Sequence, residues 1–169
     1  DCPGEQLIQH VEVEIGGQRI DRQYGDFMHL WNQLTMSSEQ ERGYNKMVGN
    51  TTQLTFTVDT HGSPIDGPCE SNGPAQVCAE RNALPETTLY VPLQFWFCRN
   101  PGLALPLIAL QYHEVKINVE LRKLDECLWA SRYKGALDKG TLPSDVANSS
   151  LVAASLYVDY VFLDTDERR

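Results

Sequence analysis

Apolar and polar residues alternate most strongly between residues 89 and 121, and this pattern predicts two strands of a sheet. The first strand spans residues 89–97, and its apolar face carries Val91, Leu93, Phe95 and Phe97. The second begins near residue 115, and its apolar face carries Val115, Ile117, Val119 and Leu121. A period of two is typical of a strand with one buried face. Residues 103–110 are apolar on both faces, and we expect them to run through the interior or under the partner sheet.

A strand of this kind needs a second layer opposite its apolar face. Burying one large apolar side chain is worth about 1.5 to 3 kcal/mol, whereas ordering one backbone unit costs about 1 to 2 kcal/mol. Since these terms nearly cancel along one strand, a single sheet gains little stability. Two facing sheets of short antiparallel strands meet this requirement. The sequence therefore predicts an all-β fold, an antiparallel jelly-roll sandwich.

Three further segments fit into this fold. Residues 11–15 alternate and end at Gly16-Gly17, a dipeptide that favours a tight hairpin turn. Helical spacing of Phe27, Leu30, Trp31 and Leu34 predicts one short helix that ends near residue 36, with its apolar face against a sheet edge or the end of the sandwich. Alternation over residues 155–164 predicts a last strand, with Leu156, Val158, Tyr160 and Phe162 on one face.

Turn-forming residues separate these elements. Residues 37–43 are polar and charged and predict solvent-facing coil. Residues 45–88 are rich in Gly, Pro and Asn and predict a long surface loop, interrupted by a short strand near residues 54–58. Asn100-Pro101-Gly102 predicts a type II turn.

Composition and charge limit the classes of function. The chain has 169 residues, of which 41% are hydrophobic, and this suits one domain with a sizeable core. Its net charge of -9 argues against direct binding to nucleic acid, because that affinity comes mainly from basic side chains. No apolar run is long enough to cross a bilayer. The chain begins at Asp1 without a methionine, and we expect it to be a piece of a longer protein.

The cysteines do not form a recognisable framework. Their number is odd, no CxxC pair occurs, and the full set is Cys2, Cys69, Cys78, Cys98 and Cys127. This pattern fits neither a disulfide scaffold nor a zinc knuckle, so reduced thiols are the default. Cys69 and Cys78 share one Gly/Pro-rich stretch and could pair in an oxidising compartment.

The sequence contains only weak signals for a catalytic site. Cys98 and His113 could act as nucleophile and base, but Cys98 ends an apolar strand and is better explained as a small buried side chain. The chain is rich in carboxylates, so pairs that could serve a glycosidase carry no signal. The four histidines are far apart and form no His-x-His pair, unlike those of a metal-binding cupin: His10, His29, His61 and His113. We therefore predict no enzyme, catalytic residue, cofactor or metal ligand.

Two asparagines, Asn50 and Asn148, lie in the N-x-[ST] pattern and in predicted loops, which makes them candidate glycosylation positions. The pattern is common by chance. A jelly-roll carbohydrate-binding module or a cupin-like enzyme stays open as the alternative class of function.

Four stretches of the chain together resemble the major capsid proteins of the nucleocytoplasmic large DNA viruses, the chlorella virus and iridovirus type. They are VEVEIGGQRID at residues 11–21, LYVPLQFWF at 89–97, NPGLALPLIALQYHEVK at 100–116 and YVDYVFLDTDER at 157–168. They occur in the same order as in that family and span most of the chain. The resemblance implies a double jelly roll, assembled as pseudo-hexagonal trimers in an icosahedral shell.

By this resemblance, residues 1–169 are a partial N-terminal jelly roll. The two opening strands precede Asp1, the end of the chain leads to the second barrel, and the 45–88 loop decorates the outer face. The implied partners are copies of the same protein and minor capsid proteins, without nucleic acid. The implied location is the virion, after assembly in the host cytoplasm and near an internal viral membrane.

Aromatic residues are enriched at contact surfaces between proteins. We therefore expect Trp31, Tyr90 and Trp96 to contribute to such surfaces, and a role in the core is the alternative for each.

Overall fold

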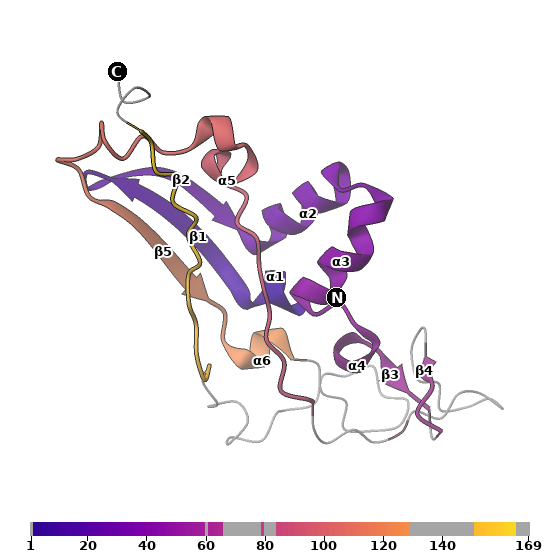
Figure 1. Ribbon diagram of the computed structural model, residues 1–169. Coiled ribbons are helices and arrows are strands. Elements are labelled where there is room, and N and C mark those ends of the chain that lie inside the picture. The colour runs from indigo at the N-terminus through magenta and orange to yellow at the C-terminus, as the bar shows by residue number, and fades with distance from the viewer. Residues whose placement is uncertain (1, 60, 66–78, 80–83, 129–150, 165–169) are drawn as a thin grey trace.

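The central feature of the computed structural model is a three-stranded antiparallel sheet with the strand order β2-β1-β5 (Figure 1). The structure describes residues 2–59, 61–65, 79, 84–128 and 151–164. The strands of this sheet are β1 (Ile8–Ile15), β2 (Gln18–Tyr24) and β5 (Val115–Leu121). A second, smaller antiparallel sheet pairs β3 (Thr57–Val58) with β4 (Pro64–Ile65). The predicted antiparallel β-structure is therefore confirmed for the described residues.

The hairpin between β1 and β2 is the element that the sequence predicts best. Gly16 and Gly17 have φ of 61° and 81°, in the left-handed region that glycine adopts without steric cost. Two consecutive residues with positive φ match the right-handed twist of the paired strands. The Gly16 N–H also donates to the Glu114 carbonyl, 2.9 Å away, and this bond ties the turn to the chain that enters β5.

Helices gather at one end of the larger sheet, where α1, α2 and α3 lie together (Figure 1). The prediction of a single short helix is wrong, because the described residues contain six α-helices and one 3-10 helix. Their bounds are α1 Pro3–Leu7, α2 Gly25–Thr35, α3 Ser38–Val48, α4 Thr52–Thr55, α5 Trp96–Arg99, η1 Pro101–Leu103 and α6 Leu124–Cys127. None of the helices in the described part of the chain is both long and apolar enough to span a bilayer.

Helix α3 replaces the coil predicted for residues 37–43. Its first turn carries Glu39 and Glu41 and its last turn carries Lys46, a distribution that complements the helix dipole. Gly49 follows the helix with φ of 80°, a common way to end an α-helix. The sequence therefore contains local signals for this helix, but its polar and charged residues show no apolar periodicity and favour a coil in the prediction.

Helix α2 has the predicted length but not the predicted orientation. It ends at Thr35, as expected, yet its buried residues are Gly25, Met28 and Asn32. The predicted apolar face points largely outward, since Leu30 and Leu34 are 58% and 76% exposed. The reason is that α2 packs against α1 through Gly25 and buries Asn32 in a polar network, described below.

The hydrophobic core lies on one face of β1. Its fully buried members include Val11, Val13, Met28 and Phe95. Val91 and Leu93 pack against them, so the inward face predicted for residues 89–95 is confirmed.

The strand predicted for residues 89–97 is nevertheless wrong. Residues 84–95 form neither a helix nor a strand. The Tyr90 N–H donates to the Met47 carbonyl at 2.8 Å, and the Gln94 carbonyl accepts from the Gln23 side chain at 3.0 Å. Residues 96–99 then form α5. The alternation thus identified the buried side of the segment and not its hydrogen-bonding partners.

The apolar segments that follow are more exposed than predicted. Residues 101–103 form a 3-10 helix in which Asn100 Oδ1 accepts from the Gly102 N–H, so the type II turn is wrong. Leu103, Leu107 and Ile108 are about half exposed, and the predicted interior crossing is therefore wrong as well.

The final described segment, residues 151–164, contains no β-strand. The predicted last strand is wrong in that respect. Its alternating apolar residues are Leu156, Val158, Tyr160 and Phe162, which are 53%, 51%, 65% and 91% exposed.

Candidate functional site

A buried carboxylate, that of Glu5, is the centre of a polar network between α1, α2 and α3. Glu5 is fully buried. Its Oε1 accepts from Asn32 Nδ2 at 2.9 Å and from the Tyr44 hydroxyl at 2.6 Å. Its Oε2 lies 2.6 Å from His29 Nδ1. Because a buried carboxylate without partners would cost several kcal/mol, on the order of 1 to 3 kcal/mol for each missing hydrogen bond, this network fixes how the three helices pack.

Small residues allow these helices to approach closely. A Cβ added to Gly25 would lie 2.4 Å from the backbone oxygens of both Glu5 and Ile8. A Cβ added to Gly4 would lie 2.9 Å from the Val91 side chain and 3.1 Å from the Val48 carbonyl. At Gly25 a side chain would require the backbone to shift, and at Gly4 it would require Val91 and Val48 to move slightly. Both glycines therefore allow close contact between α1 and its neighbours.

Cys2 lies beside this network at the N-cap of α1. It is 5% exposed, and its carbonyl accepts from the Glu5 N–H at 3.0 Å. Burial raises the pKa of the Cys2 thiol, and the nearby Glu5 carboxylate raises it further. Burial likewise raises the pKa of the Tyr44 phenol, with the Glu5 hydrogen bond as the next cause.

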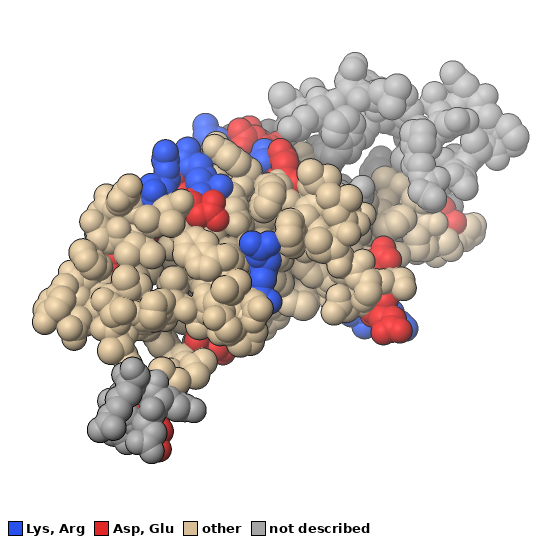
Figure 2. Space-filling view, turned by 90° about the horizontal axis from the view of Figure 1, so that it is seen from above, with Lys and Arg blue, Asp and Glu red and all other residues tan. Residues whose placement is uncertain are grey.

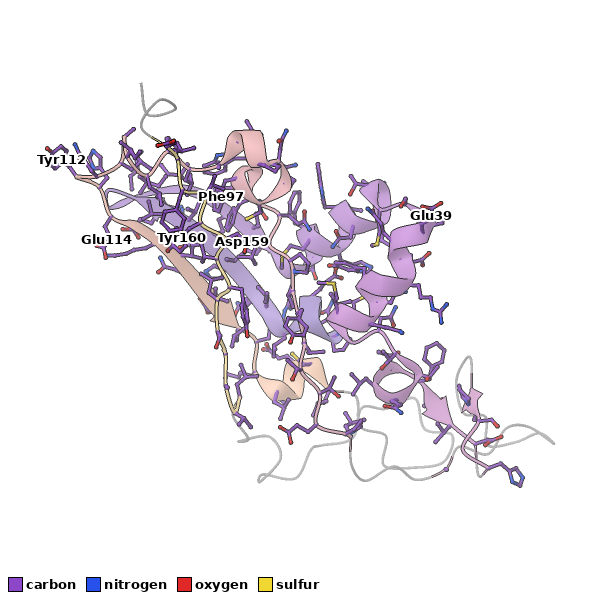
Figure 3. The ribbon with its side chains drawn as sticks, viewed as in Figure 1. Glu39, Phe97, Tyr112, Glu114, Asp159 and Tyr160 are labelled. Carbon is purple, nitrogen blue, oxygen red and sulfur yellow. The ribbon has the colours of Figure 1, made fainter. Side chains whose placement is uncertain are left out.

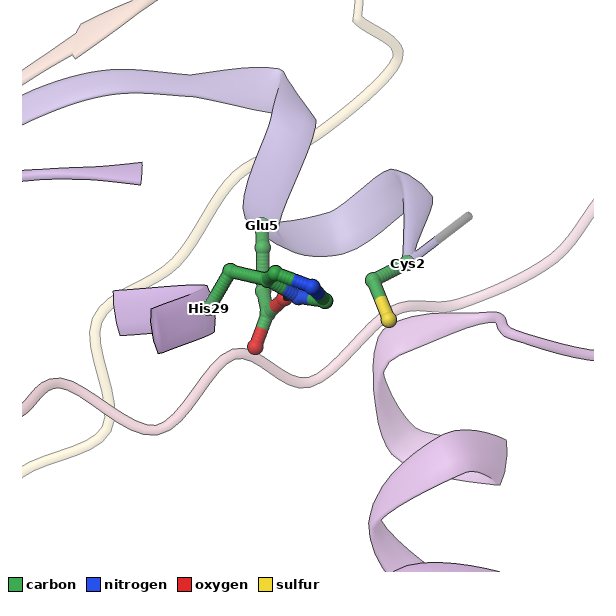
Figure 4. A group of neighbouring side chains, drawn as sticks. All are labelled: Cys2, Glu5 and His29. Carbon is green, nitrogen blue, oxygen red and sulfur yellow. Dashed lines mark hydrogen bonds and ion pairs between the residues drawn. The ribbon is translucent and has the colours of Figure 1, made fainter. Parts of the chain in front are cut away.

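The side chains of Cys2, Glu5 and His29 converge at one point (Figure 4). The Cys2 sulfur, one Glu5 oxygen and one His29 ring nitrogen all lie within 4.8 Å of one another. A cavity of about 100 Å³ adjoins them and is also lined by Asn32, Tyr44 and Glu41. The sequence pattern does not reveal this cluster, because His29 has no other histidine nearby in the chain and neither Cys2 nor Glu5 lies in a ligand motif.

The three aromatic residues expected at contact surfaces have different surroundings. Trp96 is partly buried, packs against the core and meets Phe97 edge-on with ring centroids 5.1 Å apart. Trp31 is partly covered by the Arg99 guanidinium, 4.6 Å from its ring centroid. Tyr90 is 51% exposed and lies 6.5 Å from the Tyr157 ring. Contact through any of the three stays a prediction.

Many large apolar side chains are exposed in the described part of the chain. Uncharged side chains cover most of the face in Figure 2, and charged groups gather in small clusters. Figure 3 shows Tyr160 beside the larger sheet and Tyr112 at the hairpin end of the molecule, opposite Glu39 on α3. Large side chains that are at least half exposed include Leu30, Leu34, Tyr112, Tyr157, Val161 and Phe162. Such surfaces mark places where proteins bind one another.

The other predicted positions are only partly described. Asn50 is half-buried, and its side-chain nitrogen donates to Asn45 Oδ1 at 3.3 Å. Asn148, Cys69 and Cys78 lie outside the described residues, so their glycosylation and pairing stay predictions. Cys98 is exposed, and the expectation that it is a small buried side chain is wrong.

The histidines have separate neighbours. His10 lies 3.4 Å from a Glu120 oxygen, whereas His113 lies against the Gly16 turn. The His61 N–H donates to Asp59 Oδ1 in the exposed turn between β3 and β4. Only His29 belongs to the cluster around Glu5.

Comparison with known proteins gives a consistent result. The family described as "Major capsid protein N-terminus" matches residues 2–164. The major capsid protein of Phaeocystis pouchetii virus is 72% identical over 170 residues, which cover 100% of this chain and 32% of that protein. That of Chrysochromulina ericina virus is 71% identical over 173 residues, which cover 100% of this chain and 30% of that protein.

Matches of lower identity also cover most of this chain and a minor part of the matched protein. The major capsid protein of Paramecium bursaria Chlorella virus 1 is 36% identical over 98% of this chain and 30% of that protein. Among solved structures, a quasi-atomic model of the PBCV-1 virus capsid matches 71% of this chain and 22% of that chain, with 37% identity and a TM-score of 0.47. The chain thus spans about 30% of the length of the curated relatives that it matches.

Proposed function

Since this chain belongs to the family of major capsid protein N-termini, we propose that it is part of a structural protein that builds the icosahedral shell of a large DNA virus. The observation that carries the proposal is the identity of 71% and 72%, across the whole chain, with two proteins named major capsid protein. The resemblance predicted from four stretches of sequence is thereby confirmed. The protein acts as a building block of the virion and not as an enzyme.

The proposed architecture of the whole protein is a double jelly roll, of which residues 1–169 supply part of the first barrel. Two features of the described residues support this architecture. The larger sheet is antiparallel, and its outer strands β2 and β5 each have one edge that pairs with no described strand. The apolar face of residues 156–162 is also uncovered by the described chain. A complete barrel would pair these edges and cover this face.

The proposed assembly is a trimeric capsomer, and exposed apolar side chains support it. Leu30 and Leu34 on α2 and the exposed Tyr90 are available to contact other copies or minor capsid proteins. Burial of such side chains is the main favourable term in protein association. We place the protein in the virion, after assembly in the host cytoplasm and near an internal viral membrane. The net charge of these 169 residues is -9, and this argues against direct contact of this part of the protein with nucleic acid.

Light scattering of the full-length protein after size exclusion tests this proposal. We expect a particle mass equal to three chains. A mass equal to one chain, at every concentration tested, would contradict the proposed capsomer.

A glycan array probed with the same full-length protein tests the carbohydrate-binding alternative. We expect no sugar-specific binding. Saturable binding to a defined glycan, combined with a monomeric mass, would favour the alternative function.

A further inference from the structure

We propose that Cys2, Glu5 and His29 bind a divalent transition-metal ion, with zinc as the best match. The thiol sulfur, a carboxylate oxygen and an imidazole nitrogen lie within 4.8 Å of one another, and they come from two helices and the residue that precedes the first (Figure 4). This site goes beyond the proposed shell-building role and does not depend on it.

The donor set selects the type of metal. Zinc is bound in proteins by Cys sulfur, His nitrogen and carboxylate oxygen. Calcium and magnesium prefer six or more oxygen ligands, and only one of the three donors here is an oxygen. A borderline-soft ion is therefore favoured over a hard one.

The spacing of the donors is close to that of a zinc site. Metal–ligand distances of about 2.0 to 2.3 Å in tetrahedral geometry place the ligand atoms roughly 3.2 to 3.8 Å apart. Glu5 Oε2 and His29 Nδ1 are now 2.6 Å apart, so these two atoms must separate slightly to share one ion. The His29 side chain is 40% exposed and has room to move. The Glu5 side chain, at 1% exposure, provides the fixed ligand.

Neighbouring side chains already orient this fixed ligand. Asn32 Nδ2 and the Tyr44 hydroxyl both donate to Glu5 Oε1, and this leaves Oε2 directed at His29. Hydrogen bonds of this kind hold metal ligands in position and strengthen metal binding by about 10-fold to 100-fold. The adjoining cavity of about 100 Å³ has space for one water as a fourth ligand.

A bound ion would fasten the start of the described chain to α2. Cys2 precedes α1, whose five residues are too few to form a stable helix alone. Coordination by Cys2 and Glu5 from this segment and by His29 from α2 would join them more firmly than the present hydrogen bonds. Metal binding should therefore raise the thermal unfolding temperature.

Cobalt titration of the full-length, metal-free protein tests the site, because Co²⁺ bound to thiolate has a characteristic charge-transfer absorption. We expect this band with the wild-type protein and its loss in Cys2→Ser. In His29→Asn we expect at least a tenfold weaker affinity for both Co²⁺ and Zn²⁺. The matched controls are Cys98→Ser and His61→Asn, which change exposed residues outside the site and should bind like the wild type.

A second measurement guards against variants that fail to fold. Zn²⁺ should raise the unfolding temperature of the wild type and of both controls, and at the same Zn²⁺ concentration the rise should be clearly smaller in His29→Asn, whose altered side chain is partly exposed. The proposal is overturned if the wild type shows no thiolate band, or if the band and the zinc-dependent rise persist unchanged in Cys2→Ser and His29→Asn.

Discussion

His29 Nδ1 lies 2.6 Å from Glu5 Oε2, although the two residues are 24 positions apart in the chain. This contact joins α2 to α1, and Asn32 and Tyr44 extend it to α3. One buried carboxylate thus determines the packing of three helices at the end of the larger sheet. It also explains why α2 turns a polar residue inward and leaves Leu30 and Leu34 exposed.

Removing this carboxylate should destabilise the protein. We expect Glu5→Ala to lower the free energy of unfolding by about 2 to 4 kcal/mol, because Asn32 and Tyr44 would be left without their acceptor. Urea unfolding of the full-length protein at fixed concentration measures the change. Glu86→Ala, at an exposed position, is the control and should change stability by less than about 0.5 kcal/mol. Equal stability of the two variants would disprove the structural role of Glu5.

Two glycines should respond in opposite directions to the same substitution. Gly25→Ala should cost at least about 2 kcal/mol, because the new Cβ would lie 2.4 Å from two backbone oxygens. Gly43→Ala lies within α3 with nothing inside 4 Å of the new Cβ, and it should stabilise the protein by about 0.5 to 1 kcal/mol. The same unfolding experiment compares them. The close packing of α1 on α2 would be refuted if Gly25→Ala were neutral.

Substitutions on the buried side of α2 should change stability, whereas substitutions on its exposed side should change self-association. Met28 is fully buried, so Met28→Ala should cost about 2 to 5 kcal/mol of stability. Leu34 is 76% exposed, so Leu34→Glu should leave the unfolding of the monomer nearly unchanged while weakening self-association. Light scattering and urea unfolding of both variants test this. Unaltered assembly of Leu34→Glu would exclude this part of α2 from the contact surface.

The Asp59 carboxyl, in the turn between β3 and β4, should titrate at an acidic pH below its ordinary pKa. The Ser63 N–H donates to Asp59 Oδ1 and is the main cause that lowers the pKa of this carboxyl below its ordinary value of 3.8, with the His61 N–H contributing. The pKa of Asp59 is lower in the folded state than in the unfolded state. The ionised carboxylate therefore stabilises the turn at pH values above the unfolded-state pKa, and this stabilisation is lost as the pH falls through the folded-state pKa.

Carbon-detected NMR of full-length protein with isotope-labelled aspartate measures this titration. The Asp59 signal is assigned by its loss in Asp59→Ala. A midpoint at or above 3.8 would show that the two backbone hydrogen bonds do not persist in solution.

Local chemistry made part of the fold predictable. The Gly16-Gly17 turn followed from residues that tolerate positive φ, and the end of α2 followed from the limit of its helical spacing. The buried side of residues 91–95 followed from alternation alone. In each case the signal lies within a few neighbouring residues, although residues 91–95 pack against the distant strand β1.

The missed features depend on distant partners. The inward face of α2 is set by Glu5, which no periodic pattern connects with Asn32. The Tyr90 N–H donates to a helix carbonyl and the Gln94 carbonyl accepts from the side chain of Gln23, so this alternating segment has partners other than a neighbouring strand. The cluster of Cys2, Glu5 and His29 was unpredictable for the same reason, since its members lie in no common motif.

Electron microscopy of the purified full-length protein tests the central claim most directly. The shell-building account predicts uniform particles with three-fold symmetry and a hexagonal outline. A field of separate monomers under conditions in which the protein is folded would contradict it.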